Sequence, residues 1–128
     1  MSIKWMGATL ALVAGSTVWA AAPKSTPALI AKGKASYATN CLACHGEKGE
    51  GNGPAGQYLL PKPRNFAAEP FKKGNKPDEV FKSITDGLQG STMVSFARLP
   101  EEERWALTYY VLDFQPKTKP GAAKKAKK

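Results

Sequence analysis

The sequence predicts an all-α protein with a single domain, and three observations support this fold class. Three segments combine apolar residues at helical spacing with residues that start or stop helices. No segment alternates apolar and polar residues for long enough to predict a strand. The chain of 128 residues has the length of one domain, but short helices joined by Gly- and Pro-rich loops bury little apolar surface by themselves. We therefore expect a large apolar group at the centre of the fold.

The first helix is predicted over residues 28–40. Leu29, Ile30, Gly33 and Tyr37 fall on one side at spacings of three and four. A glycine inside a helix costs about 1 kcal/mol relative to alanine. Gly33 therefore predicts close packing against another backbone.

The second helix is predicted over residues 77–86. Pro77 suits the first helical position, and Asp78 and Glu79 suit the positive end of the helix dipole. Gly87 follows as a stop signal.

The third helix is predicted over residues 100–114, where Pro100 opens the segment and Glu101–Glu103 occupy the first turn. We expect loops over 46–66 and 88–99. One face of this third helix is predicted to carry Trp105, Tyr109 and Leu112.

Residues 1–20 have the layout of a secretory signal peptide. Met1–Lys4 is a short positive start, Trp5–Val18 is an apolar run, and small residues flank Trp19 before a predicted cleavage after Ala20. The run is short for a membrane span, although a retained anchor is the alternative. In a prokaryote, this segment predicts export to the periplasm.

The net charge of +9 is concentrated in the tail formed by residues 117–128, which holds six lysines and no acid. Residues 21–116, the predicted domain, carry 12 bases and 10 acids. A nucleic-acid groove needs positive charge on a folded face, so we expect no nucleic-acid partner. The tail is predicted to be disordered. It either contacts anionic lipid or an acidic protein, or serves only solubility.

The segment Cys41-Leu42-Ala43-Cys44-His45 matches the C-x-x-C-H pattern of covalent haem attachment. Cys41 and Cys44 would form thioether bonds with the two vinyl groups of one haem c, and His45 would bind the iron. A redox dithiol would need a βαβ setting, and a zinc site would need more ligands than one His and two Cys. A chance match is the remaining alternative.

With this motif, the chain resembles the class I monohaem c-type cytochromes over residues 28–114. The resemblance is carried by Gly33 and Tyr37 in the first helix, Trp105 and Tyr109 in the last, Gly51-Asn52-Gly53-Pro54, and Pro63-Arg64-Asn65-Phe66. It implies the small cytochrome c fold, with three main helices and long loops wrapped around one covalent haem, and a close crossing of the first and last helices.

Met93 is predicted to be the sixth iron ligand. His45 is the only histidine, and Met93 is the only methionine after the predicted signal peptide. The segment Gly90-Ser91-Thr92-Met93-Val94-Ser95-Phe96 resembles the family's G-x-x-M-P-x-F loop, except that Val94 replaces proline. Ligation by lysine or an open iron site is the alternative.

Three further sets of residues are predicted to support the haem. By resemblance, a proline-adjacent carbonyl accepts a hydrogen bond from His45, with Pro54 the best match and Pro61 a rival. Arg64 could pair with a haem propionate or be a solvated surface residue. Tyr58 and Phe66 could pack on the ring.

An iron with both axial positions filled by protein has no place for a substrate. The sequence therefore predicts a monomeric one-electron carrier that is not an enzyme and that moves electrons between periplasmic or membrane redox proteins. The alternatives are a subunit of an enzyme complex, a haem protein with an open iron, and an exported binding protein without haem.

Overall fold

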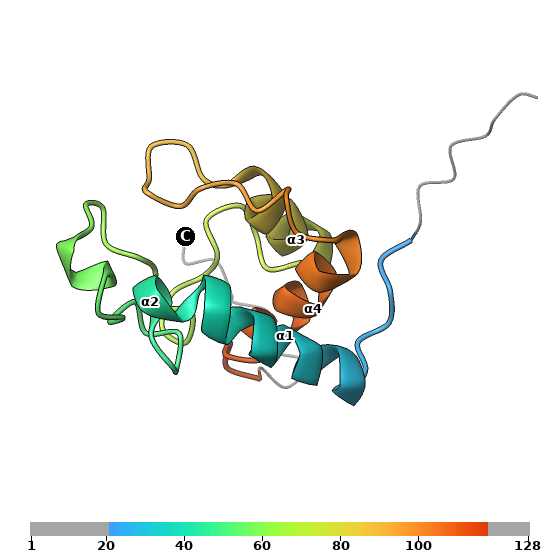
Figure 1. The fold of residues 1–128 in the computed structure, drawn as a ribbon. Coiled ribbons are helices and arrows are strands. Elements are labelled where there is room, and N and C mark those ends of the chain that lie inside the picture. The colour runs from blue at the N-terminus through green and yellow to red at the C-terminus, as the bar shows by residue number, and fades with distance from the viewer. Residues whose placement is uncertain (1–20, 118–128) are drawn as a thin grey trace, which may run out of the picture.

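The computed structural model describes residues 21–117, so the predicted signal peptide and residues 118–128 of the tail lie outside the described residues. Within 21–117 the fold is all-helical, without strands. Its elements are α1 (Pro27–Asn40), α2 (Leu42–His45), a single 3₁₀ turn η1 (Gly56–Tyr58), α3 (Pro77–Asp86) and α4 (Glu101–Leu112) (Figure 1). The predicted all-α class with three main helices is confirmed.

The helix boundaries follow local signals in the sequence. The Thr26 hydroxyl accepts a hydrogen bond from the backbone N–H of Leu29 (3.2 Å), which caps the start of α1. α3 begins at Pro77 and stops before Gly87, whose φ of 75° lies in the left-handed region. α4 is shorter than predicted and ends at Leu112.

Helices α1 and α4 pack directly against each other, and Gly33 marks their contact. A Cβ atom at Gly33 would lie 2.1 Å from the carbonyl oxygen of Ala106, which is far too close. Beside this contact, the Tyr37 ring lies edge-on to Tyr110, with ring centroids 5.1 Å apart. The close helix packing predicted from Gly33 is therefore confirmed.

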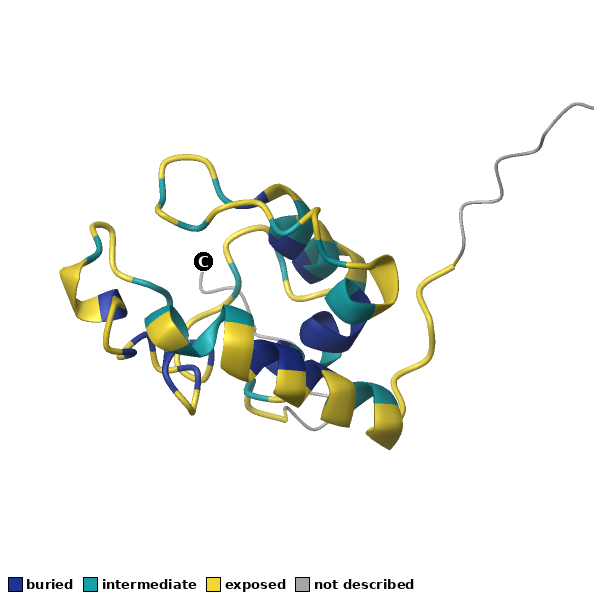
Figure 2. Ribbon diagram, viewed as in Figure 1, coloured by how far each residue is buried: buried dark blue, intermediate teal, exposed yellow. Residues whose placement is uncertain are grey.

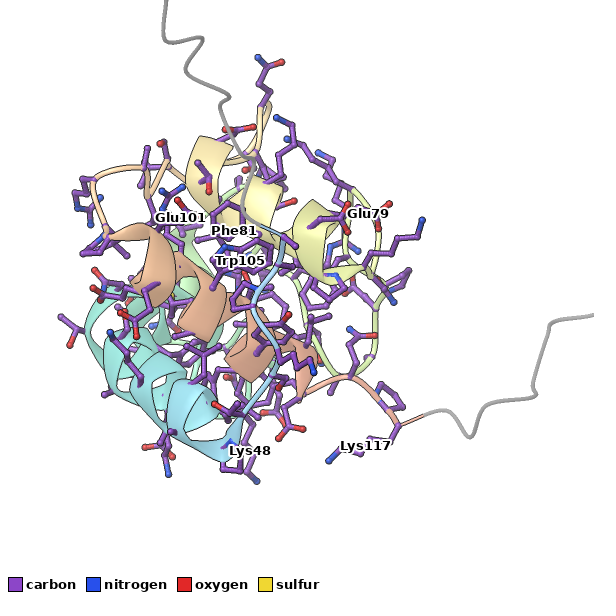
Figure 3. All side chains as sticks on the ribbon, turned by 90° about the vertical axis from the view of Figure 1, so that its right-hand side faces the viewer. Lys48, Glu79, Phe81, Glu101, Trp105 and Lys117 are labelled. Atoms are coloured by element: carbon purple, nitrogen blue, oxygen red, sulfur yellow. The ribbon has the colours of Figure 1, made fainter. Side chains whose placement is uncertain are left out.

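Helix α3 covers another side of α4 through an aromatic stack. The rings of Phe81 and Trp105 are 4.0 Å apart and nearly parallel (Figure 3). The guanidinium of Arg104 lies over the Phe81 ring and donates a hydrogen bond to the Thr85 hydroxyl (2.6 Å). Because α1 and α3 both pack on α4, its buried residues differ from the predicted face. Trp105 is buried as expected, but Tyr109 and Leu112 are only partly buried. The other buried residues of α4 are Ala106, Leu107, Thr108 and Val111.

One apolar cluster lies between the three main helices, and Figure 2 shows buried stretches of all three. We call it the central core; its members are Tyr37, Phe66, Val80, Ile84, Leu107 and Val111. The long segments between the helices surround this core. Among residues 21–117, no helix has the length and apolar character needed to cross a membrane.

Candidate functional site

The structure brings Cys41, Cys44 and His45 together on one helical turn. Cys41 ends α1, and the other two residues belong to α2. The backbone N–H groups of Cys44 and His45 both donate to the carbonyl of Cys41, at 3.1 and 2.9 Å. Residues three and four positions apart lie on the same helix face, so this turn presents two thiols and an imidazole in one direction.

The loop over residues 46–56 packs against the backbone of this turn and holds it in place. A Cβ atom at Gly53 would lie 2.4 Å from the carbonyl oxygen of Ala43, and one at Gly56 would lie 2.2 Å from that of Cys44. Glycine therefore lets the loop reach the backbone of α2. The four carbonyls of α2 accept hydrogen bonds from this loop: Leu42 from Gly46 (2.8 Å), Ala43 from Ala55 (2.8 Å), Cys44 from Gly53 (3.2 Å) and His45 from Gly51 (2.8 Å).

This carbonyl capping is a feature that the sequence reasoning missed. The available signal was the clustering of glycines after the motif, namely Gly46, Gly49, Gly51, Gly53 and Gly56. Such a cluster predicts a loop but does not identify which carbonyls its N–H groups will meet.

The imidazole of His45 is partly buried. Its ring stacks on Phe66, with centroids 4.4 Å apart. Burial lowers the pKa of His45 below its ordinary value, while the nearby backbone of Arg64 acts in the opposite direction. The neutral imidazole, which is the form that binds metal ions, is therefore favoured. Among residues 21–117, buried Nδ1 has no partner in hydrogen-bond geometry.

The backbone group beside the imidazole of His45 belongs to Arg64, so Arg64 is a second candidate for the support that was predicted from Pro54. Pro54 is exposed, and its carbonyl accepts a hydrogen bond from the side-chain amide of Gln57 (3.2 Å). A backbone neighbour that raises a histidine pKa is an acceptor, so the relevant group is the Arg64 carbonyl. Arg64 follows Pro63, so a proline-adjacent carbonyl is present, but further along the chain than expected.

The side chain of Arg64 already has protein partners. Its guanidinium donates to the carboxylate of Glu69 (2.8 Å) and to the carbonyl of Pro70 (3.0 Å). The pairing of Arg64 with a propionate stays a prediction.

The chemistry of the thiols disfavours a redox dithiol. Burial, with a smaller contribution from Cys44, raises the pKa of Cys41 to about 12. Reactive dithiols need a lowered pKa because the thiolate is the nucleophile. Both cysteines are free, and within residues 21–117 no cluster of three or more His, Cys, Asp or Glu side chains could hold a metal ion.

Met93 lies in the loop between α3 and α4, and this loop is tied to the end of α3. A Cβ atom at Gly87 would lie 2.7 Å from the Met93 carbonyl oxygen, so glycine permits the close approach. Four hydrogen bonds hold the segment: Leu88 N–H to the Met93 carbonyl (3.1 Å), Met93 N–H to the Ser91 hydroxyl (3.1 Å), the Ser95 hydroxyl to the Thr85 carbonyl (2.6 Å) and Phe96 N–H to the Ile84 carbonyl (3.1 Å).

Met93 and the Cys41 end of the motif border the same central core, against which both are packed while partly buried. Figure 1 shows the loop after α2 and the loop after α3 toward the same end of the molecule. Apolar surface is exposed on these loops, at Tyr58 (81%), Leu60 (84%) and Val94 (62%). Thiols on one face, a neutral imidazole and uncovered apolar side chains together fit a large apolar group held at this end.

Comparison with known proteins decides the family. The family model described as cytochrome c matches residues 30–115. The chain belongs to the cytochrome c family. This membership implies covalent haem c, with Cys41, Cys44 and His45 in the attachment motif, and a role in electron transfer.

Two relatives show where such domains occur. This cytochrome is 35% identical over 91 residues to the Cbb3-type cytochrome c oxidase subunit FixP of Azorhizobium caulinodans, covering 71% of the chain and 29% of the relative. It also matches a chain of the reducing HAO-like protein complex Kustc0457/Kustc0458 of Kuenenia stuttgartiensis, with a TM-score of 0.70 and 36% identity, covering 75% of this chain and 48% of that one. The cytochrome therefore spans less than half the length of either relative.

Proposed function

We propose that this cytochrome is a one-electron carrier with a single haem c, held covalently by Cys41 and Cys44 and axially by His45 and Met93. When bound, the haem supplies a one-electron redox couple. The observation that carries the proposal is the pair of fixed segments bordering one core: α2 with its capping loop, and the hydrogen-bonded Met93 loop.

In this proposal, two fixed segments of the polypeptide hold the haem. The loop over 46–56 satisfies the carbonyls of α2, and the end of α3 anchors the Met93 loop. Segments fixed in this way need little rearrangement when an electron is gained or lost. With His45 and Met93 both engaged, no position is left for a substrate, which favours a carrier over an enzyme.

The ligand pair also favours a high reduction potential. The thioether of Met93 is neutral and soft, so it stabilises the reduced state of the iron. Partial burial of Met93 and His45 disfavours additional charge at the same place.

We further propose that the chain is exported to the periplasm, is cleaved after Ala20 and moves electrons between redox proteins as a monomer. The domain would then be residues 21–116. A second candidate is a subunit of a redox complex, because the relatives belong to an oxidase and to an HAO-like complex. Size-exclusion chromatography of the native protein distinguishes the two, since a shuttle elutes alone.

The near-infrared charge-transfer band of a methionine-ligated oxidised cytochrome tests the ligand assignment. We expect the band in the wild type, its loss in Met93→Ala, and a lower reduction potential in that variant. Val94→Ala, which changes the exposed neighbour, should keep the band. A wild type that lacks the band and binds carbon monoxide readily when reduced would contradict the proposal and indicate an open site.

A further inference from the structure

We propose that Tyr37 is a positioning residue for His45, acting through a hydrogen bond from its hydroxyl to the carbonyl of Gly46. The inference rests on the proposed function, since it assigns a role to Tyr37 in presenting the haem ligand.

Tyr37 contacts both ends of the attachment segment. Its backbone carbonyl accepts a hydrogen bond from the N–H of Cys41 (2.9 Å), at the first residue of the motif. Its hydroxyl donates to the carbonyl of Gly46 (2.7 Å), the residue that follows His45. One residue of α1 therefore holds the backbone at the start and at the end of the motif.

Gly46 is a position where the backbone direction is sensitive to such a bond. Its φ of 76° lies in the left-handed region, so the chain turns sharply directly after His45. A Cβ atom here would lie 2.1 Å from the side-chain oxygen of Asn52. The Gly46 carbonyl has a second, longer hydrogen bond, from the N–H of Gly49 (3.2 Å).

The hydroxyl of Tyr37 is a dependable donor because its surroundings are fixed. Tyr37 is 2% exposed and is held by the rings of Tyr110 and Phe114, at centroid distances of 5.1 and 5.7 Å. A tyrosine buried to this extent needs a partner for its hydroxyl. The contact between α1 and α4 at Gly33 thus determines where the hydroxyl lies, and through it the exit of the chain from His45.

His45 depends on such indirect support. A metal-binding imidazole is usually oriented by a hydrogen bond at its second nitrogen. Within residues 21–117, Nδ1 of His45 is buried without a partner in hydrogen-bond geometry. The Arg64 carbonyl lies near the imidazole but outside that geometry. The ring direction therefore relies also on the stack with Phe66 and on the backbone on either side of His45.

The test compares Tyr37→Phe with Tyr110→Phe in the haem-loaded protein. Each change removes one hydroxyl from a packed tyrosine, but the structure gives the Tyr110 hydroxyl no hydrogen bond among residues 21–117. The readouts are the hyperfine-shifted proton resonances of the His45 ring in the oxidised state and the reduction potential. We expect both to move in Tyr37→Phe and to match the wild type in Tyr110→Phe.

Installing 4-aminophenylalanine at position 37 restores a donor on the same ring, and it should return the His45 resonances toward wild-type positions. The same comparison decides the question if Tyr37→Phe retains little haem. Recovery of haem content with 4-aminophenylalanine supports the proposal, and no recovery contradicts it. The inference would be overturned if the His45 resonances were unchanged in Tyr37→Phe, or if they shifted equally in Tyr110→Phe. Either result would mean that Tyr37 contributes only packing. A wild type without covalent haem would instead contradict the proposed function.

Discussion

At the scale of single residues, Gly33 shows how a missing side chain sets the distance between two helices. The residue costs helix propensity in the middle of α1. In return, α4 approaches so closely that the Ala106 carbonyl occupies the space of a Cβ atom. The ring of Tyr37, one turn further along α1, is buried at the same contact.

Gly33→Ala tests this contact because two effects have opposite signs. Helix propensity alone would stabilise the variant by about 1 kcal/mol. Overpacking against the Ala106 backbone should exceed that gain, and we expect the free energy of unfolding to fall by about 1–3 kcal/mol in chemical denaturation. Lys34→Ala, at the exposed neighbouring position, should change it by less than about 0.5 kcal/mol. A Gly33→Ala variant that is more stable than the wild type would rule out the close contact.

The residues of the site differ in how far sequence could identify them. Cys41, Cys44 and His45 were found because thioether and iron chemistry require those side chains at that spacing. The backbone group beside His45 could not be found in this way, because every residue has a carbonyl and only folding brings that of Arg64 to the imidazole.

At the scale of elements, the main helices were predictable because their ends carry strong signals. Pro77 and Gly87 predicted both ends of α3 as observed. Pro100 and the acidic first turn predicted the start of α4 to within one residue. α2 and η1 were missed because helices of four and three residues have no apolar periodicity to detect. The carbonyls of α2 accept hydrogen bonds from the loop over 46–56, and such contacts have no signal in local periodicity.

The environment of aromatic residues in the loops could not be predicted from the sequence. Tyr58 and Phe66 were both predicted to pack on the haem ring, and this packing stays a prediction for each. Their surroundings differ, since Tyr58 is 81% exposed among the described residues, whereas Phe66 is 8% exposed and stacks on His45. Both are aromatic residues in a Gly- and Pro-rich segment, so composition could not separate them.

At the scale of the whole molecule, the charge divides the chain into a nearly balanced body and a basic tail. Without the predicted signal peptide, the chain has a net charge of +8, and most of it belongs to residues 117–128. Two haem propionates would bring the body close to neutrality. Lys117 forms an ion pair with Asp113 (3.2 Å), and the contact with lipid or an acidic protein that the sequence predicts is tested below on the lysines that follow it.

Removal of residues 118–128 tests that role and leaves the Lys117–Asp113 pair in place. We expect the full-length cytochrome to bind vesicles containing anionic lipid at low salt, and the truncated form to lose most of that binding. Vesicles of neutral lipid provide the control, and the visible spectrum should be the same for both forms. Equal binding of both forms to anionic vesicles at low salt would rule out the predicted contact of the tail with anionic lipid.

Covalent haem at Cys41 and Cys44 is the claim on which the electron-carrier function depends. Denaturing gel electrophoresis followed by a haem stain tests it directly, because only covalently attached haem stays with the unfolded chain. We predict a stained band for the wild-type protein expressed with export and haem-attachment machinery, and none for the Cys41→Ser, Cys44→Ser double variant. An unstained wild-type band under those conditions would contradict the account.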